Sequence, residues 1–86
     1  MTITPHALQR YLNRSGTSEK RITKASAFLF AAADSGVAIG TDRKYYRGWI
    51  VVVKNDHIIT AYKPHTPAAQ TAVFNAMKQK VNSKPI

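Results

Sequence analysis

The spacing of apolar residues changes near Gly36, and this change constrains the fold more than any other feature of the sequence. Before Gly36, apolar residues such as Leu8, Tyr11 and Leu12 recur at the three- and four-residue intervals of an amphipathic helix. From residue 37 to residue 62, short runs rich in Val, Ile and Tyr are typical of strands. A helical pattern then returns near the end of the chain. The order α-α-β-β-β-α predicts an α+β fold, with two N-terminal helices packed on a small antiparallel sheet and a C-terminal helix after it.

Capping residues predict where the helices begin and end. Thr4-Pro5 opens the first helix, because Thr caps free N–H groups and Pro is harmless in the first turn, and Gly16 ends it. Thr17-Ser18-Glu19 starts the second helix, and Gly36 ends it. The second helix is expected to bury Ile22, Ala25, Leu29 and Ala32, with Phe28 beside them.

The third helix is expected to start at Thr66-Pro67 and to run to about residue 81, and residues 83–86 are expected to fray. Its expected inward residues are Val73, Phe74, Met77 and Val81.

Three strands are expected, over residues 37–39, 45–53 and 58–62, with a polar turn at 41–44 and a hairpin turn at Asn55-Asp56. The apolar end of the second strand does not alternate, which indicates a central strand covered on both faces, and Trp49 is expected to be buried. Because side chains alternate along a strand, Thr60 and Tyr62 should share one face with Ile58.

Length and charge limit the functions of the chain. Its 86 residues make one domain, 1–86, and 13 Lys and Arg against 4 Asp and Glu give a net charge of +9. A polyanionic partner would relieve the resulting repulsion, and nucleic acid is favoured over an anionic membrane or an acidic protein. No run approaches the roughly 18 apolar residues of a membrane span, and the first residues do not resemble a secretion signal, so a cytoplasmic protein is expected.

Metal and cofactor chemistry are not expected. The chain has no Cys, and His6, His57 and His65 are scattered among few acidic residues, which makes a poor set of metal ligands. His57 and His65 are interpreted as surface residues, with His65 as a second choice of acid or base.

The first helix carries the residues best suited to chemistry. His6, Arg10 and Arg14 follow one another at four-residue steps, opposite the apolar face. Metal-independent RNA cleavage needs a base for the 2′-OH, an acid for the departing 5′ oxygen and cations or hydroxyls for the charged phosphorane. His6 suits the first two roles, Arg10 can grip the phosphate, and Thr60 and Tyr62 can donate to a phosphate oxygen.

Other cations are assigned to RNA binding. Arg14 is expected to contact phosphate, and so are Arg43, Lys44 and Arg47, which alternate with aromatic residues in a strip up to Trp49. Lys63, next to Tyr62, is a further cation for the same site.

Several of these residues together resemble the BECR superfamily, which joins barnase-like, EndoU-like, colicin-type and RelE-like ribonucleases, many of them bacterial toxins. The resemblance rests on Ile3-Thr4-Pro5-His6-Ala7-Leu8-Gln9-Arg10, on Arg14 and on Ile58-Ile59-Thr60-Ala61-Tyr62, and it covers residues 3–63. It implies metal-independent cleavage of RNA, such as tRNA or mRNA, and an acidic antitoxin or immunity protein as partner. By position it assigns the site to His6, Arg10, Thr60 and Tyr62. The additional helix at 67–82 and the short stretch before residue 45 depart from that pattern.

Two other functions compete with a toxin-type endoribonuclease. A non-catalytic basic adaptor, such as a phage or plasmid regulator, would grip RNA or block an acidic protein with the same surface. A DNA-binding module would use the two N-terminal helices as a helix-turn-helix, but the second helix is too apolar to read bases.

Overall fold

The fold is known from a computed structural model, which describes the backbone of residues 1–82 and the side chains as far as residue 78. These residues form a five-stranded sheet in the order β1-β5-β4-β3-β2. The strands are β1 (Thr2–Ile3), β2 (Val37–Ile39), β3 (Arg43–Tyr46), β4 (Trp49–Lys54) and β5 (His57–Tyr62). The predicted α+β class is confirmed, but the sheet is mixed rather than antiparallel, since β1 pairs with β5 in parallel.

The first helix begins and ends as its caps predict. In α1 (Pro5–Ser15) the Thr4 hydroxyl accepts a hydrogen bond from the Ala7 N–H at 3.2 Å. Gly16 then takes a left-handed conformation, with φ of 68°, and its N–H donates to the Leu12 carbonyl. The same Thr4 hydroxyl donates to the carbonyl of Ile58 at 3.0 Å, so the cap also joins α1 to β5.

The second helix begins later than expected. Ser18 caps a short 3-10 turn, Glu19–Arg21, and α2 (Ile22–Ser35) follows it. Ala25, Leu29 and Ala32 are buried as predicted, but the prediction for Ile22 is wrong, since its side chain is 43% exposed. Ile22 lies in the first turn of α2, beyond the part of the helix that covers the sheet.

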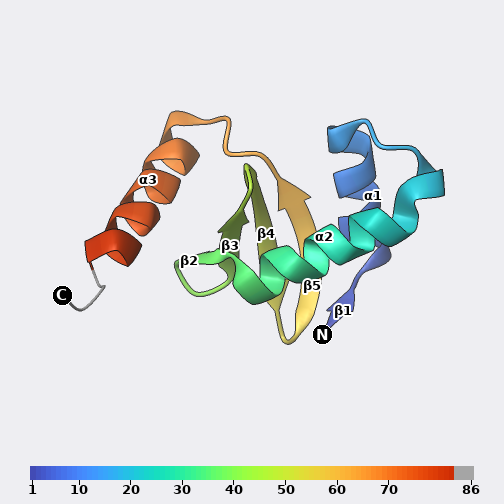
Figure 1. Cartoon of the computed structure of the whole chain (residues 1–86), viewed down its shortest axis with the longest axis horizontal. Helices are drawn as coiled ribbons and strands as arrows, with labels where there is room; N and C mark the ends of the chain where they lie inside the picture. The colour runs from blue at the N-terminus through green and yellow to red at the C-terminus, as the bar shows by residue number, and fades with distance from the viewer. Residues whose placement is uncertain (83–86) are drawn as a thin grey trace.

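Helix α2 crosses one face of the sheet and α1 lies alongside β5, and both helices contribute to the core on that face (Figure 1). This core consists of Ala7, Leu29, Ala32, Ala33, Trp49, Val51, Ile58 and Ala61. The other face carries the alternate residues of each strand, including Ile50, Val52, Thr60 and Tyr62. We call these two faces the helix face and the far face.

Strand β4 is central in the sheet, as its apolar run predicts, and Trp49, Ile50 and Val51 are buried. The expected strand over 45–53 is nevertheless two strands. Arg47 and Gly48 both have positive φ, 48° and 88°, and make the tight turn between β3 and β4. Arg43 and Lys44, expected in a turn, therefore belong to β3. The hairpin turn at Asn55-Asp56 is confirmed, with φ of 50° and 66° at its two central residues.

A bulge interrupts β5. Thr60 pairs with Val52 and Ile58 with Val53, so Ile59 has no partner on β4. The extra residue places both Ile58 and Ala61 on the helix face, which corrects the prediction that Ile58 shares a face with Thr60. On its outer side β5 pairs with β1 only at His57 and Ile58, so the rest of that edge has no strand partner among the described residues.

The last helix, α3 (Pro67–Asn82), lies apart from α1 and α2 and makes its main contacts with β2 (Figure 1). Val73 is half-buried as predicted, but Phe74 and Met77 are 67% and 42% exposed, so the prediction that they face inward is wrong. Ala69, Ala72 and Ala76 of this helix are also half-buried. The prediction that Val81 faces inward and the expected fraying of 83–86 concern side chains and residues outside the described part. No described helix is long and apolar enough to cross a bilayer.

Candidate nucleic-acid interface

The polar face of α1 holds the first half of the candidate interface. Ala7 and Leu12 bury the opposite side of this helix, which leaves His6, Gln9, Arg10 and Asn13 exposed. These four side chains line a hollow of ≈ 270 Å³, which we call the α1 hollow. The Nε of Arg10 donates to the Nε2 of His6 over 3.4 Å, a long hydrogen bond. The predicted neighbourhood of His6 and Arg10 therefore exists.

Arg14, one turn further along α1, belongs to a second group of cations. Its Nη1 donates to the carbonyl oxygen of Ala61 at 2.6 Å, which fixes the guanidinium against the unpaired outer edge of β5. Arg14, Lys63 and His65 line a second hollow, of ≈ 230 Å³, which we call the β5 hollow. The Nζ of Lys63 also lies 5.3 Å from the centre of the Trp49 ring, so the aromatic core positions this ammonium group.

The two strand hydroxyls lie elsewhere. Thr60 and Tyr62 pair across the sheet with Val52 and Ile50, on the far face. Ala61, between them, packs with Ala7 of α1 on the helix face. The structure thus separates the hydroxyls of Thr60 and Tyr62 from the α1 hollow by the thickness of the sheet, and neither residue lines either hollow.

The cations expected in one aromatic strip lie on different parts of the molecule. Arg43 pairs with Val52 on the far face, whereas Lys44 pairs with Val51 on the helix face. Arg47 lies in the turn after β3, with its guanidinium 5.3 Å from the centre of the Tyr46 ring. These three residues therefore do not form a continuous row with the α1 and β5 hollows.

The aromatic rings near the strip pack on one another instead of facing solvent together. Tyr11 stacks on Phe28 with ring centres 5.1 Å apart and lies 4.7 Å from Trp49. Phe28 in turn lies 5.5 Å from Tyr46. Trp49 is 6% exposed, which confirms that it is buried, and burial raises the pKa of the Tyr11 phenol.

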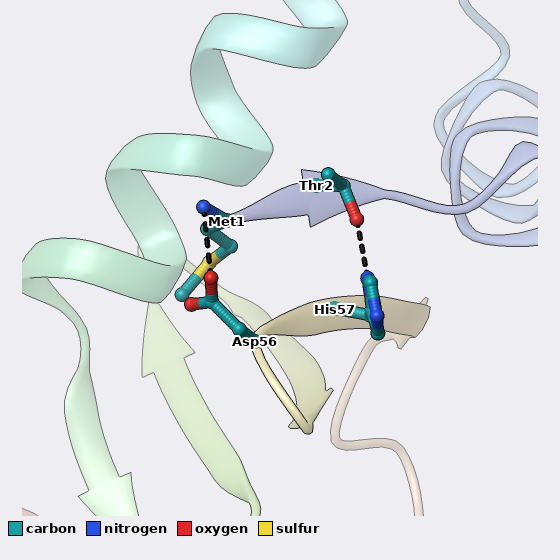
Figure 2. Close-up of polar contacts among 4 residues, drawn as sticks. All are labelled: Met1, Thr2, Asp56 and His57. Carbon is teal, nitrogen blue, oxygen red and sulfur yellow. Dashed lines mark hydrogen bonds and ion pairs between the residues drawn. The ribbon is translucent and has the colours of Figure 1, made fainter.

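Charge pairing leaves the interface strongly positive. Within the described residues, the one ion pair joins the N-terminal ammonium group of Met1 to Asp56 over 3.1 Å (Figure 2). No described Lys or Arg side chain has a carboxylate within ion-pair distance. The cations of both hollows are therefore not neutralised by the protein itself.

His57 holds β1 in place. Its Nδ1 forms a hydrogen bond with the Thr2 hydroxyl, next to the pair between Met1 and Asp56 (Figure 2). His57 and His65 are both exposed. In the described part of the chain, no group of three or more His, Asp or Glu side chains could hold a metal ion.

Sequence reasoning missed Gln9 as a member of the interface. Gln9 and Asn13 are four residues apart, as are Arg10 and Arg14, so the helical period contains the signal. The meeting of Arg14 with Lys63 and His65 joins residues nearly fifty positions apart, and only the packing of α1 on β5 reveals it.

The comparisons with known proteins give no match to any family model, any curated protein or any solved structure. The resemblance to BECR ribonucleases therefore stays a prediction from short motifs.

Proposed function

We propose that this protein binds RNA through the surface that contains the α1 hollow and the β5 hollow. We call this surface the cationic face; its charged and titratable residues are His6, Arg10, Arg14, Lys63 and His65. One observation carries the proposal: Arg10 of the α1 hollow and Arg14 of the β5 hollow are one turn apart on α1, Lys63 joins Arg14, and no carboxylate of the described chain pairs with these cations. Converging cations repel, and phosphate groups would relieve that repulsion.

The position of α2 argues against a helix-turn-helix reading of duplex DNA. Ala25, Leu29 and Ala32 of this helix are buried, and its exposed side carries Ala27 and Phe30, which offer no hydrogen bonds to base edges. An acidic protein that mimics RNA would compete for the cationic face, which is how an antitoxin-like partner would act.

The salt dependence of RNA binding tests the proposal. Three phosphate contacts, from Arg10, Arg14 and Lys63, should give a slope of about −2 when the logarithm of affinity is plotted against the logarithm of salt concentration. Fluorescence anisotropy of a labelled RNA, with duplex DNA as competitor, measures this slope. Absence of RNA binding at low salt, or equal competition by duplex DNA, would contradict the proposal.

The contact between His6 and Arg10 favours endoribonuclease activity as a second candidate function. A neutral His6 imidazole, once its Nε2 is released from Arg10, can accept the 2′-OH proton while the 2′ oxygen forms its bond to phosphorus. The bond from phosphorus to the 5′ oxygen then breaks, the 5′ oxygen takes a proton from water, and Arg10 can stabilise the charged phosphorane. Thr60 and Tyr62 have no part in this version. It predicts RNA cleavage in EDTA by the wild type but not by His6→Ala, with His57→Ala as the matched control.

A further inference from the structure

The two hollows of the cationic face lie in sequence along one helix. Arg10 lines the α1 hollow and Arg14 lines the β5 hollow, and these two residues are one turn apart, a rise of about 6 Å. That rise is comparable with the distance between a base and a neighbouring phosphate of one nucleotide chain. A single nucleotide chain lying along α1 would therefore reach both hollows.

The β5 hollow is suited to a phosphate group. Its two cations are held in place before any ligand binds: Arg14 by the Ala61 carbonyl at 2.6 Å, and Lys63 by the Trp49 ring. A guanidinium has five N–H donors, and Arg14 uses one of its groups on Ala61, which leaves donors for an anion. Preorganised cations bind phosphate with less loss of side-chain entropy than free surface lysines do.

The α1 hollow is suited to a base. Gln9 and Asn13 contribute two amides, each with donors and an acceptor, beside the His6 imidazole. Such groups match the hydrogen-bonding edges of a nucleobase, whereas a purely phosphate-binding hollow needs no acceptors. In an RNA duplex those edges are paired and lie in grooves that side chains read poorly, so a base can enter this hollow only from an unpaired strand.

From these observations we infer that the cationic face is specific for single-stranded RNA, with a base in the α1 hollow and a neighbouring phosphate in the β5 hollow. The inference rests on the proposed RNA-binding function and makes it narrower. Gln9 and Asn13 read the base, and Arg14, Lys63 and His65 hold the backbone.

The experiment compares one RNA sequence as a single strand and as a duplex, by fluorescence anisotropy. Both are made with 2′-O-methyl groups, which leave no 2′-OH to be attacked, so cleavage cannot disturb the measurement. The wild type should bind the single strand about tenfold more tightly than the duplex, since only the single strand offers unpaired base edges. Equal affinity for the two would overturn the inference and leave RNA binding standing, whereas binding to neither would refute the proposed function as well.

Matched variants locate the phosphate group. Lys63→Met keeps the apolar stem that lies against Trp49, and Lys54→Met removes an exposed lysine at the other end of β4. Lys63→Met should weaken single-strand binding about fivefold and reduce the salt slope by about 0.7, while Lys54→Met should change affinity by less than about twofold. Equal losses in the two variants would show a general charge effect and overturn the assignment of the β5 hollow.

A second pair of variants tests the base. Asn13→Ala should reduce the differences in affinity among homopolymeric single strands and change the salt slope little. The reason is that the Asn13 amide contacts a base in this arrangement, not a phosphate that releases counterions. Asn75→Ala, at an exposed position of α3, is the control. An unchanged base preference in Asn13→Ala would remove the α1 hollow from base recognition. Circular dichroism of each variant checks that the fold is kept.

Discussion

At the scale of single residues, Tyr11 shows how packing changes the chemistry of a side chain. Its ring is held between Phe28 and Trp49, and its half-buried phenol has a pKa raised above the ordinary value by burial. Burial disfavours the phenolate, so the folded state keeps the proton to higher pH than the unfolded state. Tyr11 therefore contributes stability below the ordinary pKa of 10.0, and this contribution is lost as pH rises through the raised value.

Tyr11→Phe removes this ionisation and should make folding less sensitive to alkaline pH. Between about pH 9 and pH 11 the free energy of unfolding should fall less in the variant than in the wild type. Urea unfolding at several pH values, followed by circular dichroism, measures this. Tyr45→Phe, on the far face, serves as the control, and parallel pH curves for Tyr11→Phe and the wild type would contradict the expectation.

Single-residue roles could be predicted only where the helix period determines them. The four-residue spacing of His6 and Arg10 predicts their contact, which the structure contains. The face of the sheet on which Thr60 and Tyr62 lie depends on where α1 packs, and no local pattern carries that information. The prediction that Thr60 and Tyr62 share a face is correct, because it follows from local alternation along the strand. The prediction that they lie beside His6 is wrong, because it depends on where α1 packs.

At the scale of elements, the junction between α1 and the sheet depends on Thr4. Its hydroxyl accepts from the Ala7 N–H and donates to the Ile58 carbonyl, and its own N–H donates to the same carbonyl at 3.0 Å. One side chain thus caps the helix and fixes its start against β5. The position of the whole cationic face relative to β5 depends on this junction.

Thr4→Ala should lower the free energy of unfolding by about 1–2 kcal/mol, because both hydroxyl contacts are lost. Thr4→Ser keeps the oxygen and should cost much less. Urea denaturation gives both values. A cost in Thr4→Ala no greater than that in Thr4→Ser would show that the cap contributes little.

Element boundaries were predictable where a capping or turn residue marks them. Thr4-Pro5, Gly16 and Asn55-Asp56 act as expected. The β3–β4 turn was missed because Arg47 adopts positive φ within a run of aromatic and basic residues that has no usual turn dipeptide before Gly48. Strand β1 was missed because two residues are too few to show a period.

At the scale of the whole molecule, α3 is the least integrated part of the described chain. The described residues extend over 44 × 27 × 21 Å, with α3 at one end of the long dimension (Figure 1). Its inward residues are mostly alanines, which bury little area, while Phe74 is 67% exposed. The sequence pattern alone reads Phe74 and Met77 as core residues, because it contains no information about the direction in which residues 63–66 lead the helix.

Phe74→Ser should therefore change the free energy of unfolding by no more than about 0.5 kcal/mol. Leu29→Ala, at a fully buried position of α2, should cost about 2–5 kcal/mol by leaving a cavity. Denaturant unfolding of the two variants side by side measures both. A cost above about 1 kcal/mol for Phe74→Ser would mean that this ring has a partner outside the described chain.

The hydrogen bond from Arg14 to Ala61 also bears on colloidal behaviour. Beyond Ile58 the outer edge of β5 has no strand partner among the described residues, and an edge without a paired strand offers its backbone groups to another chain. The Arg14 side chain occupies one of these carbonyls and places a positive charge beside it, so two molecules repel at the point where their strands would otherwise join. A neutral residue at position 14 would thus favour edge-to-edge aggregation even where the fold itself is intact.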